Sequence, residues 1–222
     1  MEAASTSRDG PSARRATATV VLAAGASERF GGVPKATLPV AGVPAIARVV
    51  ALAQASGTDP VVVVVGPHAR ETRGEVPDPH DVVWIENSAW ADGRTGSIQA
   101  GLHAVPSDRS ILLWPVDHPF VEAGSVQALL NASAHDRMAV WFIPTFEGHG
   151  GHPVLLDPVV VPKIEALPPG APLRRLLPVF GPQVARVPVD DFGVTASVDT
   201  PEEYLSYSAR ALERVRERWT GG

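Results

Sequence analysis

A turn of small residues followed by two basic side chains, at residues 22–35, is the part of this sequence best suited to chemistry. Small residues allow backbone N–H groups to approach phosphate oxygens closely. Arg29 and Lys35 add two positive charges within reach of a triphosphate. The run lacks the G-x-x-x-x-G-K-[ST] spacing of a Walker loop, and its glycines do not form the G-x-G-x-x-G dinucleotide fingerprint. The pattern therefore predicts a phosphate-binding loop of another kind.

Two distant aspartates could supply a metal site beside this loop. Asp117 follows the apolar run at residues 110–115, and in open α/β sheets ligands bind beyond the carboxyl ends of the strands. Asp199 stands two residues before Pro201, where a charged amphipathic pattern begins. Either carboxylate could instead cap a helix, and Thr200 is also placed to cap the last one. If both face the loop, their oxygens suit Mg²⁺.

The elements that must position these residues alternate between strand and helix. The unbroken valine run at 61–65 is typical of a strand buried on both faces, as in a parallel sheet. The other predicted strands are residues 19–22, 81–86, 110–115, 139–144, 153–156 and 184–187. The predicted helices are residues 44–54, 96–104, 121–133, 172–177 and 201–219. This order predicts a doubly wound, mostly parallel α/β sheet of the Rossmann-like kind, in three α/β/α layers.

Composition excludes several classes of site and partner. The chain of 222 residues has no cysteine, which excludes disulfides, thiolate nucleophiles and Cys-ligated metals. Its formal net charge of −5 comes without a basic stripe, so we expect neither nucleic acid nor an anionic membrane as a partner. No apolar run reaches the length of a membrane span or a signal peptide, so we expect a cytoplasmic protein. We expect a disordered tail at residues 1–17 and one domain at residues 18–222.

Five separated segments together resemble one family. Residues 22–35 are similar to the L-A-A-G-x-S-x-R-x-G…K signature of the MobA-like nucleotidyltransferases, and residues 87–102 to their N-x-x-W-x-x-G-x-x-x-S-[ILV]-x-x-G-[LI] segment. Asp117 stands in an Asp-x-Pro motif like the family's metal-binding one. Residues 148–153 resemble the G-[GH]-H-P segment, and residues 197–204 resemble D-x-D-T-P-E-[DE]-[YL], with Ser197 replacing the first aspartate. The resemblance implies the nucleotide-diphospho-sugar transferase type of fold.

The resemblance also implies roles for individual residues. Catalysis would involve Arg29, Lys35 and Asp117, with Mg²⁺, or alternatively Mn²⁺, held by Asp117 and Asp199. His152 would lie on the acceptor side. The implied nucleotide-binding residues are Leu22, Ala23, Ala24, Gly25, Ala26, Ser27, Arg29, Lys35, Asp92, Arg94 and Ser97.

Within the group, the chain most resembles the molybdenum-cofactor cytidylyltransferase family. This implies CTP as substrate, the phosphate of molybdopterin or its metal-loaded form as acceptor, and an apo molybdenum enzyme as a possible partner. The Ala23-Ala24-Gly25 sequence favours CTP, whereas the extra glycine before Lys35 resembles guanylyltransferase spacing, so the base stays open. Alternatives are GTP or UTP with a sugar, polyol or phospholactate phosphate, a small NAD(P)H-dependent oxidoreductase, and a noncatalytic cofactor-binding chaperone.

Overall fold

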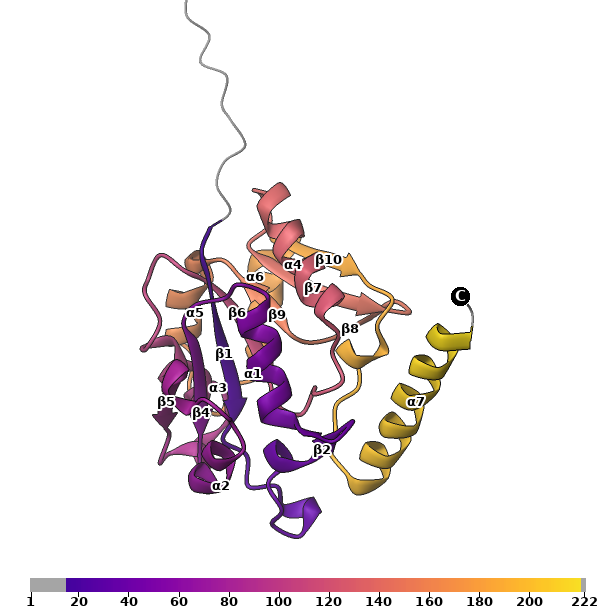
Figure 1. Ribbon diagram of the computed structural model, residues 1–222. Helices are drawn as coiled ribbons and strands as arrows, with labels where there is room; N and C mark the ends of the chain where they lie inside the picture. Colours follow the sequence, from indigo (N-terminus) through magenta and orange to yellow (C-terminus); the bar gives the residue numbers. More distant parts are fainter. Residues whose placement is uncertain (1–14, 221–222) are drawn as a thin grey trace, which may run out of the picture.

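The computed structural model describes residues 15–220, and its centre is an eight-stranded sheet (Figure 1). The strand order is β10-β7-β9-β6-β1-β4-β5, with β8 paired to β7. The bounds are β1 Thr17–Ala23, β4 Val61–Val65, β5 Val83–Glu86, β6 Ser110–Pro115, β7 Trp141–Phe146, β8 His149–Gly150, β9 Val154–Leu156 and β10 Val184–Pro188. A separate two-stranded ribbon pairs β2 Pro39–Val40 with β3 Val43–Pro44.

Parallel pairing dominates one half of the sheet and is interrupted in the other. Strand β1 pairs in parallel with both β4 and β6, and β10 pairs in parallel with β7. Strand β9 is antiparallel to both β6 and β7. This mixed, mostly parallel sheet with helices on both faces confirms the predicted Rossmann-like α/β/α class.

Seven α-helices accompany the sheet within residues 15–220. They are α1 Ala45–Ala55, α2 Ala69–Gly74, α3 Arg94–Leu102, α4 Ala123–His135, α5 Val161–Glu165, α6 Leu177–Phe180 and α7 Pro201–Thr220. The short helices α2 and α5 were not predicted, because neither is long enough to show a helical hydrophobic period. The helix predicted at residues 172–177 is instead a 3-10 turn at Leu173–Leu176 that runs into α6.

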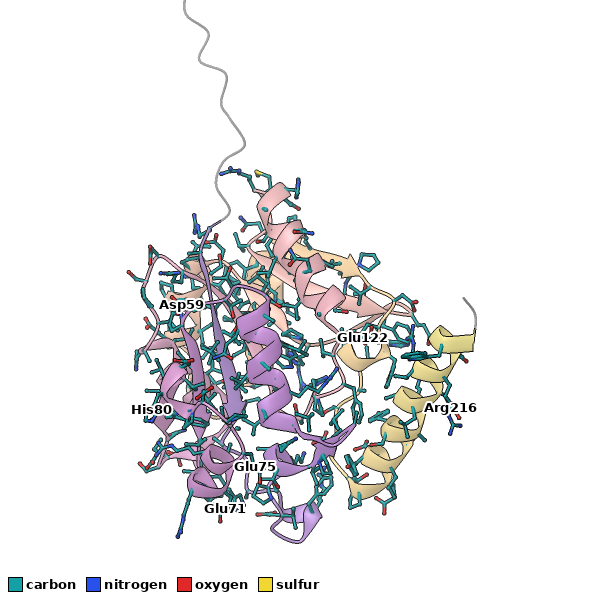
Figure 2. All side chains as sticks on the ribbon, viewed as in Figure 1. Asp59, Glu71, Glu75, His80, Glu122 and Arg216 are labelled. Carbon is teal, nitrogen blue, oxygen red and sulfur yellow. The ribbon has the colours of Figure 1, made fainter. Side chains whose placement is uncertain are left out.

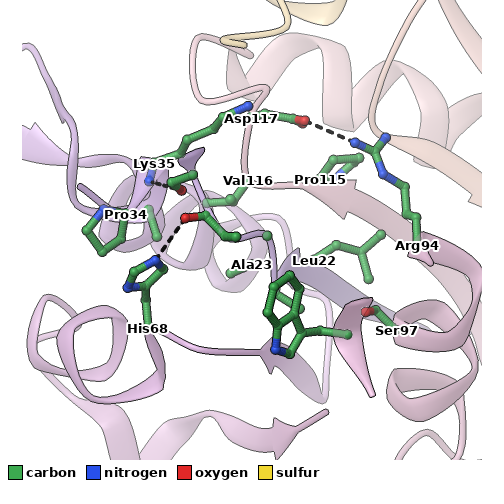
Figure 3. A pocket seen from close by; sticks show the side chains of 16 residues that line it. Leu22, Ala23, Pro34, Lys35, His68, Arg94, Ser97, Pro115, Val116 and Asp117 are labelled. Carbon is green, nitrogen blue, oxygen red and sulfur yellow. Dashed lines mark hydrogen bonds and ion pairs between the residues drawn. The ribbon is translucent and has the colours of Figure 1, made fainter. Parts of the chain in front are cut away.

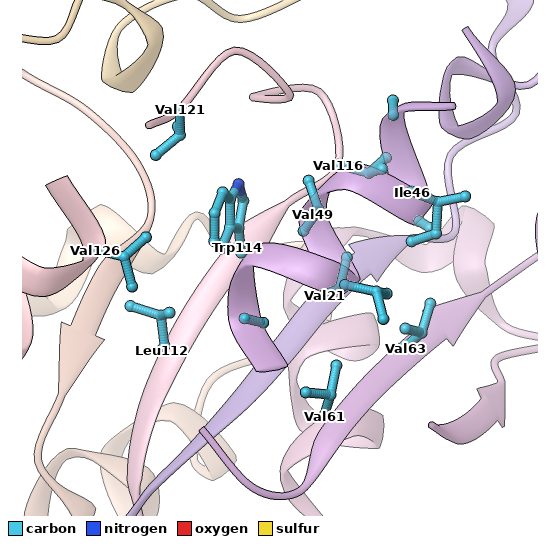
Figure 4. Packing of buried hydrophobic residues seen from close by; sticks show 14 of the residues in the cluster. Val21, Ile46, Val49, Val61, Val63, Leu112, Trp114, Val116, Val121 and Val126 are labelled. Atoms are coloured by element: carbon cyan, nitrogen blue, oxygen red, sulfur yellow. The ribbon is translucent and has the colours of Figure 1, made fainter. Parts of the chain in front are cut away.

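Alternate residues of each central strand feed two separate hydrophobic layers, because successive side chains in a strand point to opposite faces. Val21, Val63 and Leu112 pack under α1 and α4 (Figure 4). Val20 and Val62 pack on the opposite face, under α3, α5 and α6. Figure 2 shows side chains filling the space between the sheet and the helices on both sides. The helices therefore hold the sheet rigidly and leave the carboxyl ends of β1, β4 and β6 at one edge.

The N-terminal boundary lies earlier than predicted. Strand β1 begins at Thr17, which is buried, and Arg15 already forms an ion pair with Asp157 at 2.9 Å. The rest of the predicted tail, residues 1–14, lies outside the described residues. Within residues 15–220, no helix combines the length and the apolar character needed to cross a membrane.

Candidate functional site

The loop after β1 is pinned at both ends by hydrogen bonds. Ser27 adopts a left-handed conformation (φ 55°), and its hydroxyl accepts a hydrogen bond from the Lys35 backbone N–H at 3.0 Å. The ring of His68 donates to the Ala26 carbonyl at 3.0 Å. Gly66, at the end of β4, lets the two strand ends meet, since a Cβ there would lie 2.5 Å from the Ala24 carbonyl oxygen. These contacts hold the loop backbone in place.

This loop forms one wall of a cleft of about 240 Å³ at the carboxyl ends of β1 and β6 (Figure 3). The opposite wall comes from the start of α3 and from the residues that follow β6. The lining residues are Leu22, Ala23, Ala24, Gly25, Ala26, Ser27, Pro34, Lys35, Ala36, His68, Trp90, Arg94, Ser97, Pro115, Val116 and Asp117. In Figure 3 the side chains of Lys35 and Arg94 point toward Asp117 from opposite sides.

The two predicted carboxylates come from adjoining backbone segments. The Val198 N–H donates to the Asp117 carbonyl at 2.7 Å. The segment that carries Asp199 therefore lies against the residues just after β6 that carry Asp117. Arg94 Nη2 lies 3.3 Å from Asp117 Oδ2, and Lys35 Nζ lies 2.6 Å from Asp199 Oδ1. Each acidic side chain thus meets one of the cations that line the cleft.

Both carboxylates suit a divalent cation. Asp117 is only 8% exposed, and its Oδ1 has no hydrogen-bond partner among the described residues. A buried carboxylate oxygen without a donor carries an unmet need for positive charge. Partial burial raises the pKa of Asp199, but the hydrogen bond and charge of Lys35, the Ser197 hydroxyl and the charge of Arg94 outweigh it, so the pKa lies below its usual value. Asp199 is therefore ionised at neutral pH, and the donor set is the oxygen set that Mg²⁺ prefers.

Ser197, which replaces the first aspartate of the family's motif, still serves the second one. Its hydroxyl donates to Asp199 Oδ2 at 3.1 Å. Glu203 then accepts from the backbone N–H groups of Asp199 and Thr200, while the Thr200 hydroxyl accepts from the Glu203 N–H at 3.2 Å. This reciprocal capping box begins α7 at Pro201 and confirms Thr200 as its cap. The cap also fixes the backbone of Asp199.

Two histidines lie behind the carboxylates. The rings of His118 and His152 meet edge to face with centroids 4.9 Å apart. Burial lowers the pKa of His118 despite the neighbouring Asp117 carboxylate, which acts in the opposite direction. Burial, together with the charges of His118 and Arg94, lowers the pKa of His152 to about 3. Both rings are therefore neutral at pH 7 and add no positive charge to the cleft.

Two side chains that were not predicted to belong to the site hold the loop after Asp117. Arg48, from α1, donates to the carbonyls of Pro119 at 2.9 Å and Val121 at 3.3 Å. The adjacent acidic residues Asp190 and Asp191 are typical of a solvated turn, and for Asp191 this prediction is wrong. Asp191 is 2% exposed, because its carboxylate accepts hydrogen bonds from two backbone N–H groups and the Ser125 hydroxyl. Its neighbour Asp190 is exposed, as expected.

The structure brings most of the predicted site residues to one cleft. Leu22 to Ser27, Lys35, Arg94, Ser97 and Asp117 all line it. Ser97 is buried and accepts a hydrogen bond from the Asn87 side chain at 3.0 Å. Arg29 is exposed in an adjoining hollow of about 230 Å³, which it lines with Lys35 and Asp199. Asp92 is exposed and is not among the residues that line the cleft.

The predicted acceptor-side residue His152 lines a second cavity of about 610 Å³. Leu22, Arg94 and Pro115 line both cavities and so form the boundary between them. Sequence reasoning missed this cavity, as well as His68 and Trp90 as lining residues of the first cleft. For His68, its position just beyond the carboxyl end of β4 was the available signal.

The chain is similar in sequence and in fold to known proteins. The chain is 30% identical over 132 residues to the bifunctional protein GlmU of Xylella fastidiosa (strain M23), a match that covers 59% of this chain and 29% of that protein. The chain thus spans less than a third of the curated relatives it matches.

Solved structures are similar over most of the chain. A Mycobacterium sp. strain JC1 homologue of Mycobacterium tuberculosis rv0371c superposes with a TM-score of 0.74 at 27% identity, covering 89% of this chain and 97% of that one. The manganese complex of Rv0371C from Mycobacterium tuberculosis H37Rv superposes with a TM-score of 0.68 at 23% identity, covering 89% and 99%, and shares the fold. Residues 19–187 match the MobA-like NTP transferase domain. The chain therefore belongs to the MobA-like NTP transferase family, a family of nucleotidyltransferases.

Proposed function

We propose that the protein transfers the cytidylyl group of CTP to the terminal phosphate of molybdopterin, or of its metal-loaded form, and releases pyrophosphate. The observation that carries this proposal is that Lys35, Arg94 and Asp117 line one cleft whose wall includes the small residues of the loop after β1. Asp199 joins them through its ion pair with Lys35. A cleft with this charge arrangement suits a polyphosphate and a metal ion.

The nucleotide lies along the loop after β1. Its base rests near Ser97, whose hydroxyl is held by Asn87, and the Ala23-Ala24-Gly25 backbone is close enough to contact it. The triphosphate runs toward Lys35, with Arg29 in the adjoining hollow. The Ala-Ala-Gly sequence supports CTP over GTP through its likeness to cytidylyltransferases.

Transfer is a single in-line displacement. An oxygen of the acceptor phosphate forms a bond to the α-phosphorus of CTP, the bond from that phosphorus to the bridging oxygen breaks, and pyrophosphate leaves. Lys35 and Arg94 hold the phosphate oxygens and offset the charge that spreads over them. Asp117 and Asp199 would hold a Mg²⁺ ion, which would supply further charge neutralisation, and the manganese complex of a protein with the same fold supports a divalent cation here. His118 and His152 stay neutral and take no proton.

The same proposal places the protein in the cytoplasm, with an apo molybdenum enzyme as the receiver of the product. The absence of cysteine removes disulfide bonding as an argument for secretion. The proposal of this partner is supported only by the resemblance to cytidylyltransferases.

Pyrophosphate release tests the proposal. The protein is incubated with Mg²⁺, molybdopterin and each of the four nucleoside triphosphates in turn, and CTP is expected to give the fastest release. Asp117→Asn and Asp199→Asn should each lower kcat at least a hundredfold, since each removes a carboxylate charge from the metal site. Asp108→Asn, at an exposed position outside both cavities, is the matched control and should retain wild-type turnover.

Two results would contradict the assignment. Unchanged turnover in Asp117→Asn would remove the metal site from the mechanism. Absence of pyrophosphate with molybdopterin, but release with a sugar or polyol phosphate, would keep the transferase chemistry and replace the acceptor.

A further inference from the structure

The second cavity carries a charge pattern that the transfer reaction does not require. Arg94, Arg174 and Arg186 all line it, and no carboxylate does so among the described residues. The whole chain has a formal net charge of −5, so three guanidinium groups around one hollow are a local reversal of sign. Arg94 is already paired with Asp117 at the boundary with the nucleotide cleft.

Arg174 and Arg186 differ from Arg94 because neither guanidinium group has a hydrogen bond or ion pair among the described residues. Arg174 belongs to the 3-10 turn at Leu173–Leu176, and Arg186 to the edge strand β10, so separate elements deliver them to one cavity. Gly150 faces Arg186, since a Cβ on that glycine would lie 3.2 Å from Arg186 Nη1. Two unpaired guanidinium groups facing one hollow favour a bound anion.

Most of the remaining wall is apolar, although Thr95 and His152 also line the cavity. Trp141, Ile143, Leu173 and Leu177 line the same cavity, together with Ile98 and Val154. At about 610 Å³, the space is within the range that holds a small organic molecule. Apolar walls favour a ring system or another apolar body over a chain of hydroxyls.

From these observations we infer that Arg174 and Arg186 bind a second anionic group of the acceptor, separate from the phosphate that reacts. The acceptor then has three parts: a phosphate at Arg94, an apolar or aromatic body along Trp141, and an anion at the far side of the cavity. This inference rests on the proposed function, and it makes Arg174 and Arg186 specificity-determining residues. Any acceptor that lacks the second anion binds less tightly.

A matched pair of small phosphates tests the inference without turnover. Phenyl phosphate and 4-carboxyphenyl phosphate share a ring and a phosphate, and only the second carries a further anion. Isothermal titration with the wild-type protein, loaded with Mg²⁺ and a nonhydrolysable CTP analogue, should show about tenfold tighter binding of the carboxylated compound. The Arg174→Gln/Arg186→Gln double variant should bind the two compounds equally.

Arg175→Gln is the control, because Arg175 is exposed like its neighbour Arg174 but does not line the cavity. It should keep the tenfold preference. The inference would be overturned if the double variant kept the tenfold preference of the wild type, if the wild type showed no preference, or if neither compound bound.

Nucleotide binding separates the two proposals. CTP with Mg²⁺ should bind the double variant as tightly as the wild type, because Arg174 and Arg186 lie outside the nucleotide cleft. Failure of the wild-type protein to bind CTP would contradict the proposed function. If the wild type binds CTP but does not prefer the carboxylated compound, only the inference about the second cavity fails. With molybdopterin, the double variant should raise the KM of the acceptor about tenfold and leave kcat and the KM of CTP near wild type.

Discussion

Lys35 Nζ lies 2.6 Å from Asp199 Oδ1, so an ion pair joins a cation of the loop after β1 to a carboxylate just before the last helix. The two residues are 164 positions apart in the sequence. The ion pair fixes the open end of the loop against the α7 cap. Under the proposed function, a triphosphate bound to Lys35 would compete with Asp199 for the same ammonium group and would free the carboxylate to face a metal ion.

Replacing Lys35 should therefore weaken nucleotide binding. Lys35→Met removes the charge while keeping most of the apolar stem, and we expect the Kd of CTP with Mg²⁺ to rise at least tenfold, because a charge-assisted hydrogen bond contributes about 1.5–3 kcal/mol. Fluorescence or calorimetric titration measures the change. The sequence contains one other lysine, Lys163, and Lys163→Met on the exposed face of α5 should leave the Kd unchanged. Equal affinities of Lys35→Met and wild type would exclude Lys35 from the nucleotide site.

The adjacent residues Asp190 and Asp191 should respond in opposite ways to substitution. Asp191 accepts hydrogen bonds from Glu122 N–H, the Ser125 hydroxyl and Gly193 N–H, all within 2.8 Å. Asp191→Ala leaves these donors unmet, and we expect a loss of about 2–4 kcal/mol in the free energy of unfolding. Asp190→Ala removes an exposed ion pair with Arg214 and should cost at most about 1 kcal/mol. Urea denaturation distinguishes them, and similar midpoints for the two variants would contradict the buried role of Asp191.

Gly101 should tolerate no side chain. A Cβ at this position in α3 would lie 2.5 Å from Val20 Cγ1 and 2.9 Å from Val64 Cγ2, both on buried strands. Gly101→Ala forces the helix away from the sheet, and we expect it to destabilise the protein by about 1–3 kcal/mol. Gly124→Ala is the matched control, because Gly124 lies in α4 with open space around it. That variant should be more stable by about 0.4–1 kcal/mol, because alanine has less backbone freedom to lose on folding. Thermal denaturation would refute the packing argument if Gly101→Ala melted at the wild-type temperature.

His152 should make stability depend on pH in the acidic range. Its pKa is lowered from 6.5 to about 3 in the folded protein, so between these values the unfolded chain binds a proton that the folded chain does not. Stability therefore falls as pH decreases from 6.5 toward 3, and His152→Asn should reduce this slope. Denaturation midpoints measured at several pH values across this window test it. His149→Asn, at an exposed position three residues earlier, should retain the wild-type slope. A slope that His152→Asn leaves unchanged would locate the acid sensitivity elsewhere.

The sequence predicted the strands of the sheet well because their signal is local. The valines of β4 are all buried, as their unbroken apolar run indicated. The direction of β9 was not predictable, because a period of two residues is the same for parallel and antiparallel strands. Likewise, Asp190 and Asp191 are chemically identical neighbours, and only the tertiary packing around Asp191 buries one of them.

The candidate site was partly predictable for the same reason. Residues of the loop after β1 are consecutive, so their common location follows from the chain itself. Asp117 and Asp199 were expected to converge only through the family resemblance, and the Val198 N–H to Asp117 carbonyl bond is the contact that joins their segments. Arg174 and Arg186 belong to no recognisable motif. Separate elements bring them to one cavity, and the sequence around each residue does not indicate this.

The two cavities are built from largely different parts of the chain. The nucleotide cleft is built from the loops after β1 and β6 and from the start of α3, whereas most residues that line the second cavity belong to the segment 141–186, which includes β9. Only Leu22, Arg94 and Pro115 belong to both among the described residues. Under the proposed function, substitutions within residues 141–186 can therefore change which acceptor molecule receives the nucleotide without altering the residues that bind the triphosphate.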